Sequence, residues 1–334
     1  MLKNTFFALA LALPALACAQ SPDTVLISNV PQLVEPIPDP VELTTNARAA
    51  TAPRAAQFSL VDSDDGTAAY GRLLKLRSAA ALVVSQDQGH LLYAKNTDAV
   101  MPIASITKLM TAMVVLDSGL PLEEEVVIDQ ADVDLLKGTR SRLKVGVMLT
   151  RRELLKLALM ASENRAAAAL ARAYPGGVAT FVQAMNQKSR ELGMRDTRFL
   201  DSTGLNPGNV STAHDLALMV YAGYQYPLIR EFTTSESHRI ASADRRHRVV
   251  AFRNSNGLVR SHHWEIGLSK TGYINEAGRC LVMQATIATK PVIIVLLDSW
   301  GKFTRIADAN RIKRWVEQLD LGVPLAIPGK PRMG

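Results

Sequence analysis

The chain has little cysteine, and its histidines are not spaced as metal ligands. Cys18 and Cys280 are the only cysteines in 334 residues, which excludes a disulfide framework and a cysteine-based zinc site. The six histidines show no His-Glu-x-x-His or comparable spacing, and His262 and His263, beside Trp264, are expected in a surface loop. The sequence also lacks a glycine-rich phosphate loop. It therefore predicts neither a metal site nor a cofactor, and Cys280 is expected in a buried strand.

Residues 1–19 have the pattern of a secretory signal peptide. Lys3 precedes an apolar run from Phe6 to Ala17 that is too short to span a membrane, and small residues end the segment. Cleavage after Ala19 would remove Cys18, whereas a lipobox-like end would make Cys18 a lipidated N-terminus. We favour cleavage because Ala15 stands where a lipobox usually has Leu. Both alternatives predict an exported, periplasmic protein, and only lipidation predicts contact with a membrane.

Composition divides the rest of the chain into three parts. Residues 20–71 mix prolines with Asp, Thr, Asn and Ala and show no sustained periodicity, which predicts a flexible tether. Residues 72–321 hold the periodic apolar segments and are long enough for one large core. Residues 322–334 are expected to be a C-terminal tail.

Strand patterns occupy both ends of the predicted domain, and helical patterns fill its middle. A capping box, Thr150 with Glu153, marks one helix start. We predict an α/β (α+β) fold: an antiparallel five-stranded sheet built from both chain ends, flanked by terminal helices, with an all-helical region inserted. The expected strands are 80–84, 90–95, 249–252, 269–274, 279–286 and 291–297; the expected helices begin at Ser105 and cover 154–160, 166–173, 181–192, 214–221 and 303–319.

Ser105 and Lys108 stand one helical turn apart where an apolar segment begins. Residues with this spacing share a helix face, so the hydroxyl and the amine can share a proton. A serine hydroxyl needs an adjacent base to become a nucleophile. A lysine serves as that base when burial lowers its pKa from about 10.4 toward roughly 7–8. The apolar residues that follow Lys108 predict such burial.

The Ser-x-x-Lys spacing alone is weak evidence, because two other pairs share it. Ser141/Lys144 falls in an alternating segment that predicts a half-exposed strand, and Ser299/Lys302 falls in a predicted loop before the last helix. Two later motifs favour the first pair. They are the only Ser-x-Asn, Ser162-Glu163-Asn164, and the only Lys-Thr-Gly, Lys270-Thr271-Gly272.

These three motifs, in this order, are the signature of penicillin-binding proteins and class A β-lactamases. From about residue 80 to 319 the chain resembles D-alanyl-D-alanine peptidases of the low-molecular-mass penicillin-binding-protein family, and more narrowly the endopeptidase subgroup (penicillin-binding protein 7 type). The resemblance implies a β-lactamase/transpeptidase-like fold and a serine DD-peptidase domain over 72–321. The matching segments are Pro102–Asp117, Ser162–Ala168, Ser202–Leu205, Ser211–Ala213 and Lys270–Gly272.

The resemblance also implies a role for each motif residue. Ser105 is implied to attack a D-Ala carbonyl and form an acyl-enzyme, with Lys108 accepting its proton and Ser162 relaying the proton to the leaving amine. The implied substrate-binding residues are Asn164 for the substrate amide, Lys270 for the proton relay, Thr271 and Gly272 of the strand motif, Tyr273 for a backbone oxyanion donor, and Arg305 for a carboxylate.

The implied substrate is peptidoglycan, and β-lactam antibiotics are the implied covalent inhibitors. Carboxypeptidase relatives carry a further β-domain and a membrane-binding helix after the segment that matches this chain. The resemblance therefore favours an endopeptidase that cuts D-Ala–diaminopimelate cross-links over a D-Ala–D-Ala carboxypeptidase, although both reactions break a bond after D-Ala. A serine β-lactamase is less favoured, because no clear glutamate-bearing loop lies between Ser162 and Lys270. The intact trio of motifs argues against a non-catalytic murein-binding module.

The net charge of +7 does not by itself indicate nucleic acid. The basic residues are scattered, so most are expected on solvated faces, with a general attraction to an anionic cell-wall polymer. We therefore predict no nucleic-acid partner.

Overall fold

The computed structural model describes residue 60, residues 74–241 and residues 249–320. All of these belong to one compact unit within Ala49–Gly334. The predicted signal peptide, nearly all of the tether and the whole of the C-terminal tail lie outside the described residues. Among the described helices, none is long and apolar enough to cross a membrane.

A five-stranded antiparallel sheet forms the centre of the unit, as the sequence predicts. The strand order β2-β1-β11-β10-β9 places both ends of the domain side by side, because β1 pairs with β11. Strand β9, which carries the Lys-Thr-Gly motif, is an edge strand. The strands are β1 Ser78–Ser85, β2 Leu91–Lys95, β9 Glu265–Ile274, β10 Gly278–Ile287 and β11 Lys290–Ser299.

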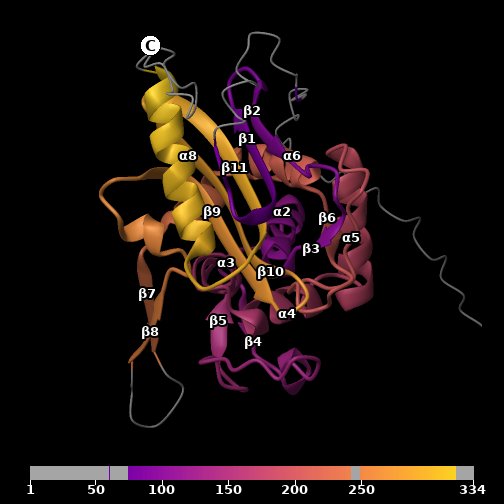
Figure 1. Ribbon diagram of the computed structural model, residues 1–334. Helices are drawn as coiled ribbons and strands as arrows, with labels where there is room; N and C mark the ends of the chain where they lie inside the picture. The colour runs from indigo at the N-terminus through magenta and orange to yellow at the C-terminus, as the bar shows by residue number, and fades with distance from the viewer. Residues whose placement is uncertain (1–59, 61–73, 242–248, 321–334) are drawn as a thin grey trace, which may run out of the picture. The chain divides into compact units, whose positions relative to one another are not determined.

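The two faces of the sheet pack against different helices (Figure 1). Helix α8 (Thr304–Asp320) covers one face, and α6 (Ala213–Tyr224) with the helical region covers the other. Alternate residues of β1 serve the two cores: Leu82 joins the core with the helical region, and Val83 joins the core beneath α8. Because both faces are covered, the inner strands are nearly continuous apolar runs rather than alternating ones. Of the terminal helices that the sequence predicts to flank the sheet, the described residues contain the C-terminal one, α8.

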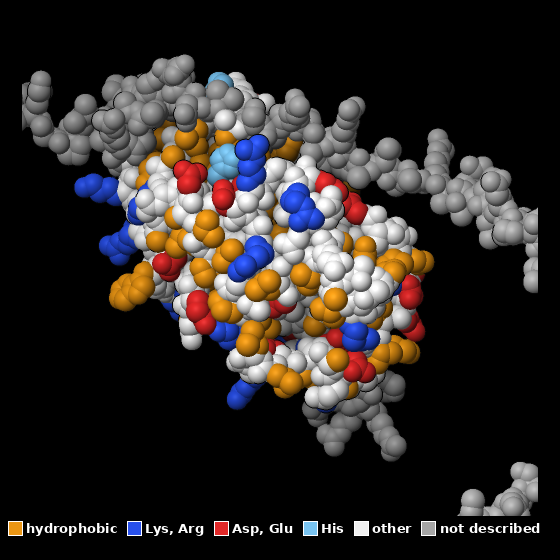
Figure 2. All heavy atoms as spheres, turned by 90° about the vertical axis from the view of Figure 1, so that its right-hand side faces the viewer, with side chains coloured by type: hydrophobic (Ala, Val, Ile, Leu, Met, Phe, Trp, Pro, Cys, Tyr) orange, Lys and Arg blue, Asp and Glu red, His pale blue; other side chains and the backbone are white. Residues whose placement is uncertain are grey.

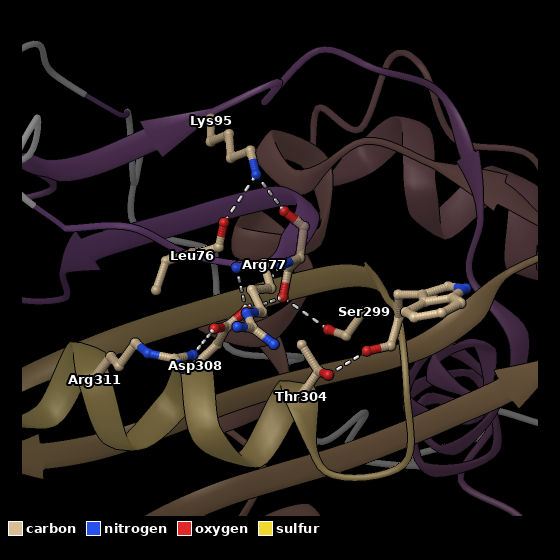
Figure 3. Close-up of polar contacts among 9 residues, drawn as sticks. Leu76, Arg77, Lys95, Ser299, Thr304, Asp308 and Arg311 are labelled. Carbon is tan, nitrogen blue, oxygen red and sulfur yellow. Dashed lines mark hydrogen bonds and ion pairs between the residues drawn. The ribbon is translucent and has the colours of Figure 1, made fainter.

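Asp308 fastens α8 to the beginning of β1 (Figure 3). Its fully buried carboxylate accepts hydrogen bonds from the backbone N–H groups of Arg77 at 2.9 Å and Ser78 at 2.8 Å, and from the Ser78 hydroxyl at 2.7 Å. The Ser78 hydroxyl also lies 2.7 Å from that of Ser299, the last residue of β11. Arg311 supplies an ion pair to the same carboxylate. This cluster fixes the first turns of α8 against the sheet.

The helical region contains each helix predicted between residues 105 and 221, together with α7, which the sequence does not predict. Thr150 and Glu153 form the expected capping box: the Thr150 hydroxyl accepts from the Glu153 N–H at 3.1 Å, and the Glu153 carboxylate accepts from the Thr150 N–H at 3.0 Å. The helices are α2 Lys108–Asp117, α3 Arg151–Met160, α4 Asn164–Arg172, α5 Gly177–Glu191, α6 and α7 Pro227–Thr234.

Short two-stranded ladders and single 3₁₀ turns connect these helices. The ladders are β3 Met101–Pro102 with β6 Val210–Ser211, β4 Glu125–Val127 with β5 Met148–Thr150, and β7 Ser237–Ala241 with β8 Val249–Arg253. The 3₁₀ turns are η1 Ala104–Thr107, η2 Gln130–Asp132 and η3 Gly257–Arg260.

Two sequence predictions need correction. The half-exposed strand predicted around Ser141 and Lys144 is wrong: the segment is a loop in which the Ser141 hydroxyl accepts from the Leu143 N–H at 3.0 Å. A hydroxyl that bonds its own backbone favours a turn over a strand. The Ser299/Lys302 pair, predicted to lie in a loop, does so only in part, because Ser299 is the buried last residue of β11.

Candidate active site

Ser105 and Lys108 meet at the junction of η1 and α2. Ser105 lies inside the 3₁₀ turn, and Lys108 is the first residue of the α-helix. In a 3₁₀ turn, residues three apart are nearly eclipsed, which brings their side chains together. The Lys108 Nζ atom lies 2.7 Å from Ser105 Oγ, a distance across which a proton can be exchanged. The helix-borne pair expected from sequence is therefore present, with its serine in the turn before the α-helix.

The Lys108 amine is completely buried and makes two further contacts. It donates to Asn164 Oδ1 at 2.8 Å and to the backbone carbonyl of Thr203 at 2.5 Å. Burial lowers the pKa of Lys108 to about 7, in spite of the opposing charges of Asp201 and Glu163. A substantial fraction of this lysine is thus the free base near neutral pH, as a general base requires.

Ser162 and Lys270 form a second pair of a hydroxyl and an amine. Ser162 follows α3 in a left-handed backbone conformation (φ 60°), and its hydroxyl lies 2.8 Å from the Lys270 amine. Lys270 is buried in β9 and also donates to the carbonyl of Thr271 at 2.9 Å. Burial, and then the charges of Lys108 and Arg305, hold the pKa of Lys270 well below its ordinary value. Two serines and two buried amines therefore converge from three separate segments.

Two glycines allow the backbones around Ser105 to approach each other. A Cβ on Gly272 would lie 2.8 Å from the carbonyl oxygen of Ile103 and 3.2 Å from the backbone nitrogen of Ser105. A Cβ on Gly204 (φ +79°) would lie 2.0 Å from the carbonyl oxygen of Ala104. Neither site has room for a side chain. The edge strand β9 can therefore lie directly against the turn that carries Ser105.

Thr271 and Tyr273 flank this contact on β9. The Thr271 hydroxyl lies 2.7 Å from the Ser255 hydroxyl. The Tyr273 side chain is half-exposed, and the Arg279 guanidinium sits 4.5 Å from its ring centroid, a cation–π distance. The backbone of Tyr273 follows Gly272 directly and so lies beside the Ser105 turn.

Arg305 lies in the first turn of α8 and contacts the strands rather than an open surface. Its Nη1 atom donates to the carbonyl of Gly272 at 2.9 Å and to that of Cys280 at 3.1 Å. Burial, together with the charge of Arg279, lowers the pKa of Arg305. In this structure the arginine braces β9 at the glycine that touches the Ser105 turn.

The structure adds residues that the sequence does not reveal as part of the site. The Thr139 hydroxyl accepts from Asn164 Nδ2 at 2.9 Å, which orients the amide so that its oxygen faces Lys108. Asp201 accepts hydrogen bonds from the backbone N–H groups of Thr203 at 3.1 Å and Gly204 at 2.6 Å. These bonds shape the loop that presents the Thr203 carbonyl. A backbone carbonyl can act as an acceptor whatever the residue type, so the sequence does not reveal it. The only signal was the Ser202–Leu205 segment, which is among those that match the peptidase family.

Charged side chains of both signs are interspersed on the face drawn in Figure 2. No continuous basic surface covers that face. Across the described ranges, no three or more His, Cys, Asp or Glu residues are grouped so as to hold a metal ion.

A serine beside a buried lysine, facing a Lys-Thr-Gly edge strand across a Ser-x-Asn loop, defines the class of active-site serine DD-peptidases. Residues 67–301 match the peptidase S11 family, described as D-alanyl-D-alanine carboxypeptidase, and the chain belongs to this family.

Relatives of known name and structure agree with this assignment. The chain is 50% identical over 254 residues to a D-alanyl-D-alanine endopeptidase of Pseudomonas aeruginosa, covering 76% of this chain and 81% of the relative. It is 46% identical over 243 residues to a D-alanyl-D-alanine endopeptidase of Escherichia coli, covering 73% and 78%. The Streptomyces K15 DD-transpeptidase structure superposes with a TM-score of 0.67 at 29% identity, covering 72% of this chain and 97% of that one.

Proposed function

We propose that this protein is a serine DD-peptidase that hydrolyses D-alanyl peptide bonds of peptidoglycan, with D-Ala–diaminopimelate cross-links as its main substrate. The observation that carries the proposal is the 2.7 Å contact between Ser105 Oγ and the amine of Lys108, whose pKa burial lowers to about 7. The names of the two relatives at 50% and 46% identity support the endopeptidase reaction.

The acylation step uses two lysines: Lys108 acts on Ser105, and Lys270 holds Ser162. Neutral Lys108 takes the proton of Ser105 as Oγ attacks the D-Ala carbonyl carbon. The oxyanion that forms is bound by the backbone N–H groups of Ser105 and Tyr273, and such donors are worth about 3–4 kcal/mol each. Ser162, held 2.8 Å from Lys270, relays the proton that Lys108 took to the leaving nitrogen as the C–N bond breaks, so that Lys108 is again neutral and can accept a proton from the attacking water. Water then attacks the ester and restores free Ser105.

Substrate binding uses the unpaired edge of β9. A peptide that lies along an edge strand gains main-chain hydrogen bonds and acts as an added strand. Asn164 would hold the peptide amide of the substrate, and Thr271 would bind the carboxylate on the leaving side. Arg305 would support that carboxylate only by turning from the carbonyls of Gly272 and Cys280, so we assign it first to bracing the strand.

Defined muropeptides test the proposal directly. Purified protein is incubated with cross-linked dimers and with uncross-linked pentapeptides, and the products are identified by mass. We expect monomers from the dimers, and no cleavage by Ser105→Ala. Release of D-Ala from pentapeptides, with intact dimers, would instead assign carboxypeptidase activity, which the family description favours. Fast nitrocefin turnover would indicate a β-lactamase.

The proposed cellular setting follows from the sequence. We propose that residues 1–19 direct export, that residues 20–71 tether the domain, and that the protein works in the periplasm with β-lactams as covalent inhibitors. Stable labelling of wild-type protein by fluorescent penicillin, and none after Ser105→Ala, would support covalent inhibition at this serine. Cell fractionation checks the location.

A further inference from the structure

Lys137 and Glu276 form an ion pair between the helical region and the sheet. Lys137 belongs to the loop between η2 and β5, and Glu276 belongs to the turn between β9 and β10. Both side chains are partly exposed. The pair therefore joins two parts of the fold that otherwise face each other across the site.

Both partners lie close in sequence to groups of the site. Two residues after Lys137, Thr139 holds the amide of Asn164 at 2.9 Å, and Ser141 of the same loop donates to the Glu163 carboxylate at 2.6 Å. On the side of the sheet, Glu276 follows Tyr273 by three residues. The ion pair thus joins the loop that holds Asn164 to the turn that follows Tyr273.

The loop that carries Lys137 is held in one conformation by Asp134. Partial burial alone would raise the pKa of Asp134, but the hydrogen bonds it accepts lower it. Because its carboxylate ties together both ends of the tight turn, the amine of Lys137 is presented from a fixed backbone. The donors are the backbone N–H groups of Leu136 and Lys137, each at 2.9 Å, and the N–H and hydroxyl of Thr139 at 2.8 and 2.7 Å.

The proposed reaction gives the substrate a direction along β9. The leaving side binds at Thr271, and the scissile carbonyl lies at the N–H of Tyr273. The acyl arm of the substrate must then continue toward Ile274 and the β9–β10 turn. An arm of a few residues ends at the Lys137–Glu276 pair.

We propose that Lys137 binds a carboxylate on the acyl arm of the substrate and that Glu276 occupies the same ammonium in the free protein. This inference rests on the proposed function. An anionic arm replaces one carboxylate by another and releases Glu276 to water. A neutral arm either separates Lys137 from Glu276 without offering the ammonium a new carboxylate, or binds without contacting the ion pair. The exchange therefore selects substrates by the charge of the arm that stays on Ser105.

Two synthetic peptides test this inference on the full-length protein. Each contains a D-Ala–diaminopimelate bond, the bond that the proposed function cleaves, and their acyl arms differ only in a carboxylate or a carboxamide. We expect kcat/KM to favour the anionic peptide by about two- to fivefold in low salt, the size of a partly exposed ion pair. The preference should arise in KM and shrink as salt is added.

Variants separate recognition from stability. Lys137→Met should bring the ratio of the two kcat/KM values close to one, Lys137→Arg should keep the preference, and Glu276→Gln should increase it. Lys290→Met is the matched control, since Lys290 pairs with Asp320 at the opposite end of β11. It should retain the wild-type ratio.

The outcomes distinguish this inference from the proposed function. Wild-type protein that cleaves both peptides equally, or Lys137→Met that keeps the preference, would overturn the role of Lys137 and leave the peptidase assignment standing. Wild-type protein that cleaves neither these peptides nor any muropeptide would instead contradict the proposed function. A thermal melt of Lys137→Met shows whether an altered ratio comes from a folded protein.

Discussion

Lys108 is the residue whose protonation sets the pH range of the proposed reaction. Burial lowers its pKa to about 7, and only the neutral amine can accept the Ser105 proton. Raising the pH through 7 therefore increases the active fraction. We expect kcat/KM to fall about tenfold for each pH unit below 7, as measured with a peptide that contains a D-Ala–diaminopimelate bond between pH 5 and 8.5.

The Lys108→Arg variant is the control for this profile, because a guanidinium cannot lose its proton in this range. It should be inactive at every pH. A wild-type profile that stays flat from pH 5 to 8 would contradict the assignment of Lys108 as the base.

Gly272 is the residue whose lack of a side chain lets β9 reach Ser105. In Gly272→Ala, the new Cβ would meet the Ile103 carbonyl at 2.8 Å, so the strand has to move away. A misplacement of about 1 Å at a reacting group costs on the order of a hundredfold in rate. We expect that loss in the second-order rate constant for labelling by fluorescent penicillin.

Gly257→Ala serves as the matched substitution. Its Cβ would meet only Arg260 Nη2, at 3.9 Å, and η3 lies outside the proposed catalytic groups. Its labelling rate should stay within about twofold of wild type. Equal labelling rates for Gly272→Ala and wild type would show that the close approach is not required.

At the scale of elements, the buried Asp308 carboxylate ties α8 to the beginning of β1, beside the apolar core that the two elements share. Asp308→Ala would leave the N–H groups of Arg77 and Ser78 without their acceptor (Figure 3). Buried donors left unsatisfied cost about 1–3 kcal/mol each, so we expect a loss of roughly 3 kcal/mol in the free energy of unfolding. Urea titration followed by circular dichroism measures it.

Lys313→Ala removes another ion pair of α8, with Glu317, from a partly exposed position. It should cost less than about 1 kcal/mol. Because Arg305 lies one turn before Asp308, the Asp308 variant should also slow penicillin labelling, whereas Lys313→Ala should not. Equal stabilities for the two variants would contradict the anchoring role.

The sequence predicted the elements that have a strong repeating pattern. The five sheet strands and the long helices follow from runs of β-branched residues and from helical spacing of apolar ones. Strands of two or three residues, such as β3 and β4, are too short to show any period. Helix α7 was not predicted, and the loop at Ser141 was mistaken for a strand because local hydroxyl bonds overrode its alternation.

The site was predictable to the extent that it consists of side chains in known motifs. Lys108 hydrogen-bonds both Ser105 and Asn164, and Lys270 hydrogen-bonds Ser162. The carbonyl of Thr203 and the hydroxyl of Thr139 were not predictable, because long-range contacts of common residue types leave no local pattern. The bracing of Gly272 by Arg305 depends likewise on the tertiary placement of α8.

At the scale of the whole molecule, the reactivity of Cys280 shows whether the centre of the sheet is shielded from solvent. It is fully buried in β10, and burial raises the pKa of its thiol to about 11. Protein that lacks residues 1–19, and with them Cys18, should therefore react with a disulfide reagent at pH 8 more than about a hundredfold slower when native than when unfolded. The absorbance of the released thiol measures both rates. Rapid labelling of Cys280 in the native protein would contradict its burial in the sheet.

The pairing of β1 with β11 has a consequence for how the protein comes into being. Ser78 and Ser299 are separated by 221 positions along the chain, so this junction closes only after nearly all of the domain has been synthesised. Contacts this distant make folding slow. Lys270 belongs to the strands that arrive last, whereas Ser105 arrives early. A nascent or truncated chain would thus present its serine without the opposing amine, and hydrolytic competence would appear only at the end of biogenesis.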